Sequence, residues 1–174
     1  MSLVVFLRGV NVGGHNTFRP AVLAKELSDF DVVNIGAAGT FVIRKPRGEG
    51  RVRREFKSRL PFEADIMICE GQDLIHMASA VRFPGIPSRR DVVRFVSVLG
   101  SLDYTLPAVP ISFPPKGEWL LKIIGVHGRF LFGAYRRQMK AVGYLGQIDK
   151  LCGVPATTRN WNTITTIINT LNTA

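Results

Sequence analysis

Apolar and polar positions along the first half of the chain predict a mixture of strands and helices. Residues 3–7 are apolar on both faces, as in a central strand that is covered on both sides. The other predicted elements are a helix over 19–30, strands over 32–35 and 40–44, a helix over 51–60 and a strand over 65–69. The order strand, helix, strand, strand, helix, strand is that of the ferredoxin-like split βαβ unit. A doubly wound sheet would need regular strand–helix alternation, which this half lacks.

The second half predicts a less regular version of the same mixture. A helix over 71–81 is followed by a proline- and glycine-containing break over 82–90. Beyond it we expect a strand over 91–99, a short edge strand over 109–113, a hairpin of 118–126 with 129–135, and a helix over 142–152. We therefore predict an α+β fold of two ferredoxin-like subdomains, the second degenerate. The predicted boundaries are 1–81 for the first subdomain, 82–90 for a linker and 91–174 for the second, which ends in a C-terminal helix.

The loop after the first strand is rich in glycine and asparagine, and we interpret it as a candidate ligand site. Glycines permit a positive φ and close approach by a ligand, and backbone N–H groups at a strand-to-helix turn attract anions. The candidate residues are Arg8, Asn11, Gly13, Gly14, His15 and Asn16. The alternative is a plain turn in which Arg8 makes an ion pair at the rim. The spacing fits neither a dinucleotide-binding nor a Walker loop.

A second candidate site lies before the terminal helix, whose apolar stripe has helical spacing. The stripe consists of Trp161, Ile164, Ile167, Ile168 and Leu171. Thr158 or Asn160 is a suitable helix cap. Polar side chains at this helix start would also suit an anion, which makes ligand-binding candidates of Arg159, Asn160, Trp161 and Asn162. The alternative is a capped structural helix with Trp161 in the core.

The charge of the chain favours an anionic partner. Lys and Arg number 23 against 13 Asp and Glu, which gives a net charge of +10 and a pI near 10.3. One segment is especially basic, and we interpret it as a candidate nucleic-acid contact made by Arg44, Lys45, Arg47, Arg51, Arg53, Arg54 and Lys57. Such a partner could be nucleic acid, a nucleotide, a phosphate metabolite or an acidic protein. The alternative is a solvated helix face, and no RNP1-type motif is present.

Composition argues against several other classes of protein. No apolar run approaches the length of a membrane span, and the apolar start before Arg8 is too short for a signal peptide, so we expect a cytoplasmic protein. Cys69 and Cys152 are far apart in apolar contexts without a CxxC motif, which indicates structural thiols. The histidines show no ligand spacing. We expect neither a metal nor another cofactor.

Two stretches of the sequence carry a family resemblance. LRGVNVGG over 7–14 and ATTRNWNT over 156–163 resemble LLRGINVGG and ATTRNWNT of a bacterial family, the domain-of-unknown-function 1697 family. The resemblance implies an α+β fold of two ferredoxin-like subdomains and no established activity. It also suggests that the two stretches meet in space.

Three departures from the family pattern affect this picture. His15 stands where the family usually has a lysine. The turn Ala37-Ala38-Gly39-Thr40 replaces a polar stretch that resembles QSGN, so a polar site there would be largely lost. The third departure is the proline-rich segment 101–115, which replaces a stretch that looks helical in the family.

Three functions remain open at this point. The first is a non-enzymatic binder of a phosphate-bearing ligand, either nucleic acid or a nucleotide, through the basic segment and the anion sites. The second is a small enzyme in which Arg8 holds an anionic substrate, His15 transfers protons and Trp161 stacks. The third is an interaction or scaffold protein, for which pairing of exposed sheet edges permits a homodimer. The sequence does not decide whether the protein is an enzyme.

Overall fold

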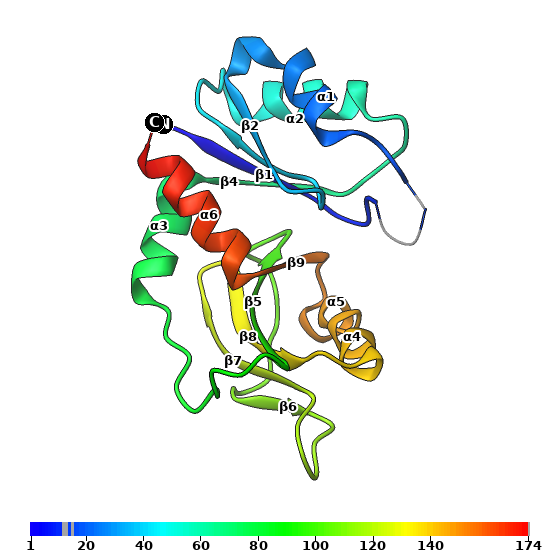
Figure 1. Cartoon of the computed structure of the whole chain (residues 1–174), viewed down its shortest axis with the longest axis vertical. Helices are drawn as coiled ribbons and strands as arrows, with labels where there is room; N and C mark the ends of the chain where they lie inside the picture. The colour runs from blue at the N-terminus through cyan, green and yellow to red at the C-terminus, as the bar shows by residue number, and fades with distance from the viewer. Residues whose placement is uncertain (12–13, 15, 174) are drawn as a thin grey trace. The chain divides into compact units, whose positions relative to one another are not determined.

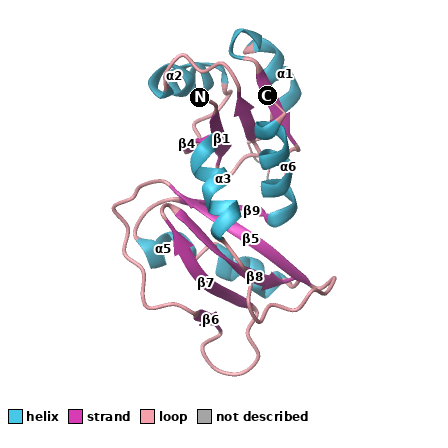
Figure 2. Cartoon of the chain, turned by 90° about the vertical axis from the view of Figure 1, so that its left-hand side faces the viewer, coloured by secondary structure: helices cyan, strands magenta, loops and turns pink. Residues whose placement is uncertain are grey.

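A computed structural model covers the chain, and the structure describes all residues except 12, 13, 15 and 174. The chain divides into two compact units, one of Met1–Ala78 with Thr165–Ala174 and the other of Ser79–Ile164. Each unit contains one antiparallel sheet with accompanying helices (Figure 1, Figure 2). The predicted α+β fold class is therefore confirmed.

The first unit is built on a four-stranded sheet with the strand order β2-β3-β1-β4. Its strands are β1 (Leu3–Leu7), β2 (Val32–Ile35), β3 (Thr40–Ile43) and β4 (Ile66–Glu70). Its helices are α1 (Pro20–Glu26), the 3-10 turn η1 (Ser28–Phe30), α2 (Glu49–Arg59) and α3 (Gly71–Ala80), whose last two residues belong to the second unit. The central strand β1 is buried along its whole length, as its uniformly apolar sequence predicts.

Helices α1 and α2 cover one face of this sheet (Figure 1). Leu23 of α1 and Phe56 of α2 pack with Val5 and Leu7 of β1 in one apolar core. The single helix expected over 19–30 is wrong in detail, because α1 ends at Glu26 and a 3-10 turn follows. Ser and Asp, which begin that turn, are weak helix formers that compete with the backbone for hydrogen bonds.

The second unit is built on a five-stranded sheet with the strand order β6-β7-β8-β5-β9. Its strands are β5 (Val92–Leu99), β6 (Ile111–Phe113), β7 (Leu121–His127), β8 (Phe130–Arg136) and β9 (Ala156–Asn160). Its helices are α4 (Met139–Leu145), α5 (Ile148–Cys152) and the start of α6 (Trp161–Asn172). Phe95 and Leu99 of β5 pack with Ile148 and Cys152 of α5 in the core of this unit.

The two sheets share one pattern of strand order. Without β6, the second order reads β7-β8-β5-β9, which matches β2-β3-β1-β4 strand for strand in chain order. Where the first unit has α1, the second has the segment 100–120, in which the structure places β6 and no helix. Proline lacks the N–H that a helix interior needs, so its repeated occurrence there excludes an equivalent helix. The two units therefore share a strand order, and the described residues of the second contain no counterpart of α1.

Two expectations for the second half need correction. The helix expected over 142–152 is two helices. The helical conformation is interrupted between Leu145 and Ile148, where Gly146 lowers helix propensity. The stretch Ala156–Asn160 was expected to be only the approach to the terminal helix. It is instead the edge strand β9, which pairs antiparallel with β5 over its whole length.

The structure also divides the chain differently from the sequence-based boundaries. Thr165 and the residues after it belong to the first unit, where the Leu171 side chain packs against Gly71 so closely that a Cβ there would lie 2.6 Å away. The segment expected to be a linker, 82–90, lies within the second unit. Ile86 in this segment is buried against Val92, which is not typical of a free linker.

Candidate functional site

The positive charge of the chain is concentrated in the second unit. Ser79–Ile164 contains twelve Lys and Arg against four Asp and Glu, a formal charge of +8. The first unit contains eleven against nine, a formal charge of +2. The second unit therefore attracts anions more strongly than the first, although the sequence singled out the basic helix of the first.

The basic segment of the first unit is partly neutralised by its own neighbours. On α2, Arg53 Nη2 lies 3.2 Å from Glu49 Oε1, and Arg59 Nη2 lies 3.0 Å from Glu55 Oε2. Arg51 places its guanidinium over the Phe30 ring, 5.9 Å from the centroid. These contacts are exposed and each is worth little, yet they favour the solvated-face alternative. Four exposed side chains complete this surface, those of Lys45, Arg47, Arg54 and Lys57.

Arg44, the first residue of the predicted nucleic-acid contact, makes its contacts within the protein. Its side chain is half-buried, and Nη2 donates to the Thr170 carbonyl oxygen at 3.4 Å. Its Nε is buried without a hydrogen-bond partner among the described residues. Arg44 therefore packs against α6 inside the first unit.

The glycine-rich loop holds its asparagines in turn interactions. Asn11 Nδ2 donates to the Ala37 carbonyl oxygen at 2.9 Å, and Asn11 Oδ1 accepts the Phe18 N–H at 3.0 Å. Asn11 and Asn16 both have positive φ, 54° and 50°, as does Gly14 at 78°. These contacts agree with the turn-chemistry interpretation of the loop. The other two candidates, Gly13 and His15, lie outside the described residues.

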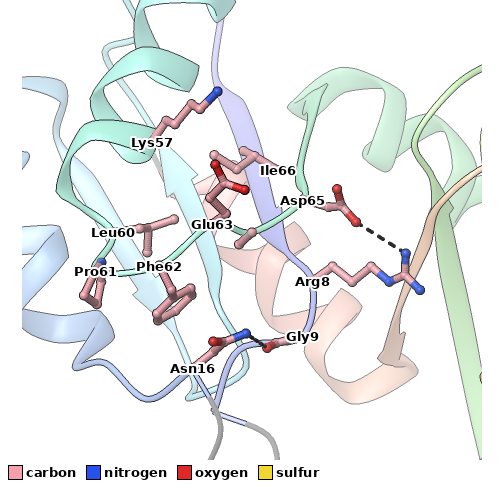
Figure 3. Close-up of a pocket in the computed structure, with 11 residues that line it drawn as sticks. Arg8, Gly9, Asn16, Lys57, Leu60, Pro61, Phe62, Glu63, Asp65 and Ile66 are labelled. Carbon is pink, nitrogen blue, oxygen red and sulfur yellow. Dashed lines mark hydrogen bonds and ion pairs between the residues drawn. The ribbon is translucent and has the colours of Figure 1, made fainter.

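A hollow of about 720 Å³ lies beside the end of β1 in the first unit (Figure 3). Arg8 Nη1 lies 3.3 Å from Asp65 Oδ2, which is the rim ion pair weighed from the sequence. Asn16 Nδ2 donates to the Gly9 carbonyl oxygen at 3.2 Å. The remaining lining residues are Lys57, Leu60, Pro61, Phe62, Glu63, Ala64 and Ile66. Two cations and two carboxylates are among the lining residues, so the formal charge of the lining is balanced.

A smaller and more basic hollow lies in the second unit. Its volume is about 200 Å³, and three arginines line it: Arg89, Arg94 and Arg137. Asn160 at the end of β9 completes it, together with Trp161 and Asn162 at the start of α6. We name this set the arginine hollow; its other lining residues are Pro87, Ser88, Val92 and Val93. Three of the four predicted residues of the C-terminal motif are thus brought together with cations that are distant in sequence.

Aromatic side chains and backbone carbonyls position the arginines of this hollow. The Arg94 guanidinium lies over the Phe83 ring, 5.3 Å from its centroid, and Arg94 Nη2 donates to the Ile86 carbonyl oxygen at 3.4 Å. Phe83 in turn packs edge-on against Trp161 at 5.1 Å. Arg137 Nε donates to the Arg90 carbonyl oxygen at 2.7 Å. Such anchoring lowers the entropic cost of holding a ligand.

Asp91 is the carboxylate that contacts this cluster. Its Oδ1 lies 3.0 Å from Arg89 Nε, and its Oδ2 lies 3.6 Å from Arg136 Nη1. Asp91 pairs with Arg89 and Arg136 and does not neutralise the other two arginines of the hollow. Among the described residues, Arg94 and Arg137 contact backbone carbonyls or an aromatic ring. The arginine hollow therefore keeps a positive surplus.

Arg159, unlike the other three predicted residues of the C-terminal motif, does not line the arginine hollow. Only 7% of it is exposed, and Nη1 donates to Thr157 Oγ1 at 2.8 Å and to the Thr158 carbonyl oxygen at 2.9 Å. Burial lowers the pKa of its guanidinium to about 10. Asn160 performs the expected capping, because its Oδ1 accepts the Thr163 N–H at 2.8 Å.

Cysteine thiols and metal ligands are two further classes of functional group. Cys69 and Cys152, which both lie in the described part of the chain, are buried and form no disulfide, as the interpretation of structural thiols requires. The described residues contain no group of three or more His, Cys, Asp or Glu side chains that could hold a metal ion. Among the helices of the described chain, none is both long enough and apolar enough to cross a membrane.

Comparison with known families matches residues 1–101 to the family described as "Protein of unknown function (DUF1697)". That range is more than half of the chain. The chain belongs to the DUF1697 family. The family resemblance is thereby confirmed; the match includes LRGVNVGG over 7–14, whereas ATTRNWNT over 156–163 lies beyond it. No curated protein matches this sequence.

A solved structure supports the fold of this DUF1697 protein. The conserved bacterial protein SP0830 from Streptococcus pneumoniae is similar over 98% of both chains, with 15% sequence identity and a TM-score of 0.61. At such low identity the similarity establishes a shared fold and nothing about activity.

Sequence reasoning missed the three arginines that line the hollow of this DUF1697 protein. Arg89 was assigned to a linker, Arg94 to a buried strand, and Arg137 follows the hairpin. The run Arg89-Arg90 after Pro87 was a signal of local charge. Nothing in the spacing indicated that β5, β8 and β9 would bring these residues to Asn160 and Trp161.

Proposed function

We propose that this DUF1697 protein is a non-enzymatic binder of a phosphate-bearing ligand, nucleic acid or nucleotide, and that its second unit makes the principal contact. The observation that carries the proposal is the arginine hollow within a unit of formal charge +8. Guanidinium groups match phosphate oxygens in a two-pronged geometry, so arginine suits phosphate better than lysine does.

The basic helix α2 is the competing contact surface. Its positive charges are exposed, but Glu49 and Glu55 pair with two of them, and the unit around it is close to neutral. We assign α2 a supporting role in long-range attraction. Binding through either surface would weaken steeply with salt, because phosphate contacts release counterions.

The test is a fluorescence titration of the nucleic-acid-free protein with single-stranded RNA, single-stranded DNA and duplex DNA at several salt concentrations. Two triple variants remove three positive charges each. Arg89→Gln/Arg94→Gln/Arg137→Gln changes the arginine hollow, and Arg51→Gln/Arg54→Gln/Lys57→Gln changes α2. We expect the first variant to lose at least about tenfold in affinity and the second to lose less.

The two variants carry the same net charge, so a general effect of net charge would lower the affinity of both for nucleic acid equally. A larger loss in the α2 variant would transfer the contact to the first unit. Absence of binding by the wild-type protein to every probe at low salt would overturn the proposal. Thermal unfolding of both variants verifies that each remains folded.

A second candidate function concerns the hollow of the first unit. Its volume of about 720 Å³ is typical of sites for small ligands, and Arg8 and Lys57 could hold an anionic group. This is the small-enzyme alternative, in which an anionic substrate binds beside the glycine-rich loop. A thermal-shift screen of phosphate and carboxylate metabolites tests it. Stabilisation that Arg8→Gln abolishes and the exposed Lys25→Gln preserves would favour it; no stabilisation would remove it.

A further inference from the structure

We propose that the arginine hollow selects a terminal phosphate, a phosphomonoester, over the internal phosphodiesters of a nucleic-acid chain. This inference rests on the proposed function and specifies its ligand. The chemistry is shared by a free nucleoside monophosphate and by the phosphorylated end of a strand.

The size of the arginine hollow favours the end of a ligand. The arginine hollow measures about 200 Å³, below the roughly 300–1,000 Å³ of ordinary ligand sites. A phosphate with part of its sugar is a small occupant. An internal phosphodiester must have chain leaving in two directions, and grooves that follow a strand span several nucleotides. A hollow of this size therefore suits the end of a ligand.

The charge of the arginine hollow favours a dianion. A phosphomonoester carries a charge between about −1.5 and −2 at neutral pH, whereas a phosphodiester carries −1. Three arginines line the hollow, and Asp91 contacts only Arg89 among them in the described part of the chain. The surplus of guanidinium groups over carboxylates matches a dianion better than a monoanion.

The hydrogen-bond donors of the hollow lie beside an apolar wall. Arg137 uses Nε toward a backbone carbonyl, and no described residue accepts a hydrogen bond from its two terminal nitrogens. Arg94 is fixed over Phe83, which also packs against Trp161. The donors therefore sit beside a half-buried indole that offers an apolar wall to the sugar or base attached to the phosphate.

The test compares two single-stranded RNAs of one sequence, one with a 5′-phosphate and one with a 5′-hydroxyl. We expect the phosphorylated strand to bind at least about tenfold more tightly. Arg137→Gln, which changes an exposed side chain, should reduce this ratio to near one. The α2 triple variant should weaken both strands together and preserve the ratio. Arg94→Gln is a second hollow variant, checked for folding by thermal unfolding.

Each result is decisive. Equal binding of the two wild-type strands would overturn the terminal-phosphate inference and leave the proposed function intact. Absence of binding to both strands and to a nucleoside 5′-monophosphate would overturn both. A ratio that survives in both Arg137→Gln and Arg94→Gln would place the selectivity outside the arginine hollow. Competition by the monophosphate, tested against the phosphorylated strand, separates a free nucleotide from a strand end as the preferred source.

Discussion

Gly39, at the end of the turn between β2 and β3, illustrates how one residue is fixed by its surroundings. Its φ is +83°, and a Cβ there would lie 2.7 Å from Val10 Cγ2 and 2.8 Å from Leu7 Cβ. Gly36 begins the same turn with a φ of +68°, but open space surrounds it. The two glycines therefore share a backbone requirement and differ in packing.

This difference gives a matched pair of variants. Gly39→Ala combines backbone strain with overpacking and should lower the free energy of unfolding by about 2–4 kcal/mol. Gly36→Ala adds strain alone and should cost about 1–2 kcal/mol. Urea unfolding of both proteins measures the difference. Equal losses would show that the neighbours of Gly39 move aside without cost.

Residues of the candidate site were harder to predict than residues of the turn. The sequence indicated that Asn160, Trp161 and Asn162 belong to a helix start, because capping is a local property. The sequence could not indicate that Arg94 belongs to the site, because nothing near it in the apolar strand shows which residues its side chain contacts. Its partners, Phe83 and the Ile86 carbonyl, are contacts that only the folded sheet creates.

Helix α6 depends on the cap that β9 delivers. Asn160 ends the strand, and its side chain accepts the Thr163 N–H at 2.8 Å. Many residues of this helix are Thr and Asn, which are poor helix formers, so the cap and packing must stabilise it.

Removing the cap should therefore be measurable. Asn160→Ala should lower the free energy of unfolding by about 1 kcal/mol, whereas Asn160→Ser keeps an acceptor and should cost much less. Chemical unfolding, monitored by circular dichroism, provides the comparison. Similar losses in both variants would attribute the effect to contacts other than the cap.

Most helices and strands could be predicted from the sequence, and a few predictions were wrong. Strand β1 could be predicted because five consecutive apolar residues indicate a buried strand, and all five are buried in the structure. Strand β9 was missed because Thr-Thr-Arg-Asn resembles a helix cap, and because edge pairing with β5 is a long-range event. Periodicity cannot report such pairing.

The whole molecule is divided within a single helix. Ile164 and Ile167 are both fully buried and only three residues apart in α6, yet Ile164 belongs to the second unit and Ile167 to the first. This division offers a direct test of the two-unit organisation.

Replacing each isoleucine by alanine should destabilise a different unit. Each substitution removes buried methyl groups and should cost about 2–5 kcal/mol. Hydrogen exchange followed by mass spectrometry should show faster exchange in β1–β4 for Ile167→Ala and in β5–β9 for Ile164→Ala. Faster exchange of the same peptides in both variants would contradict the division.

The first unit takes up Thr165 and the residues after it, and this has a consequence for synthesis on the ribosome. Its sheet strands are translated first, but the Leu171 side chain that packs on Gly71 is translated only after the whole second unit. Domains ordinarily fold in the order in which they emerge. Here the second unit is contiguous and has all its residues earlier, so the half of the protein that is begun first is completed last.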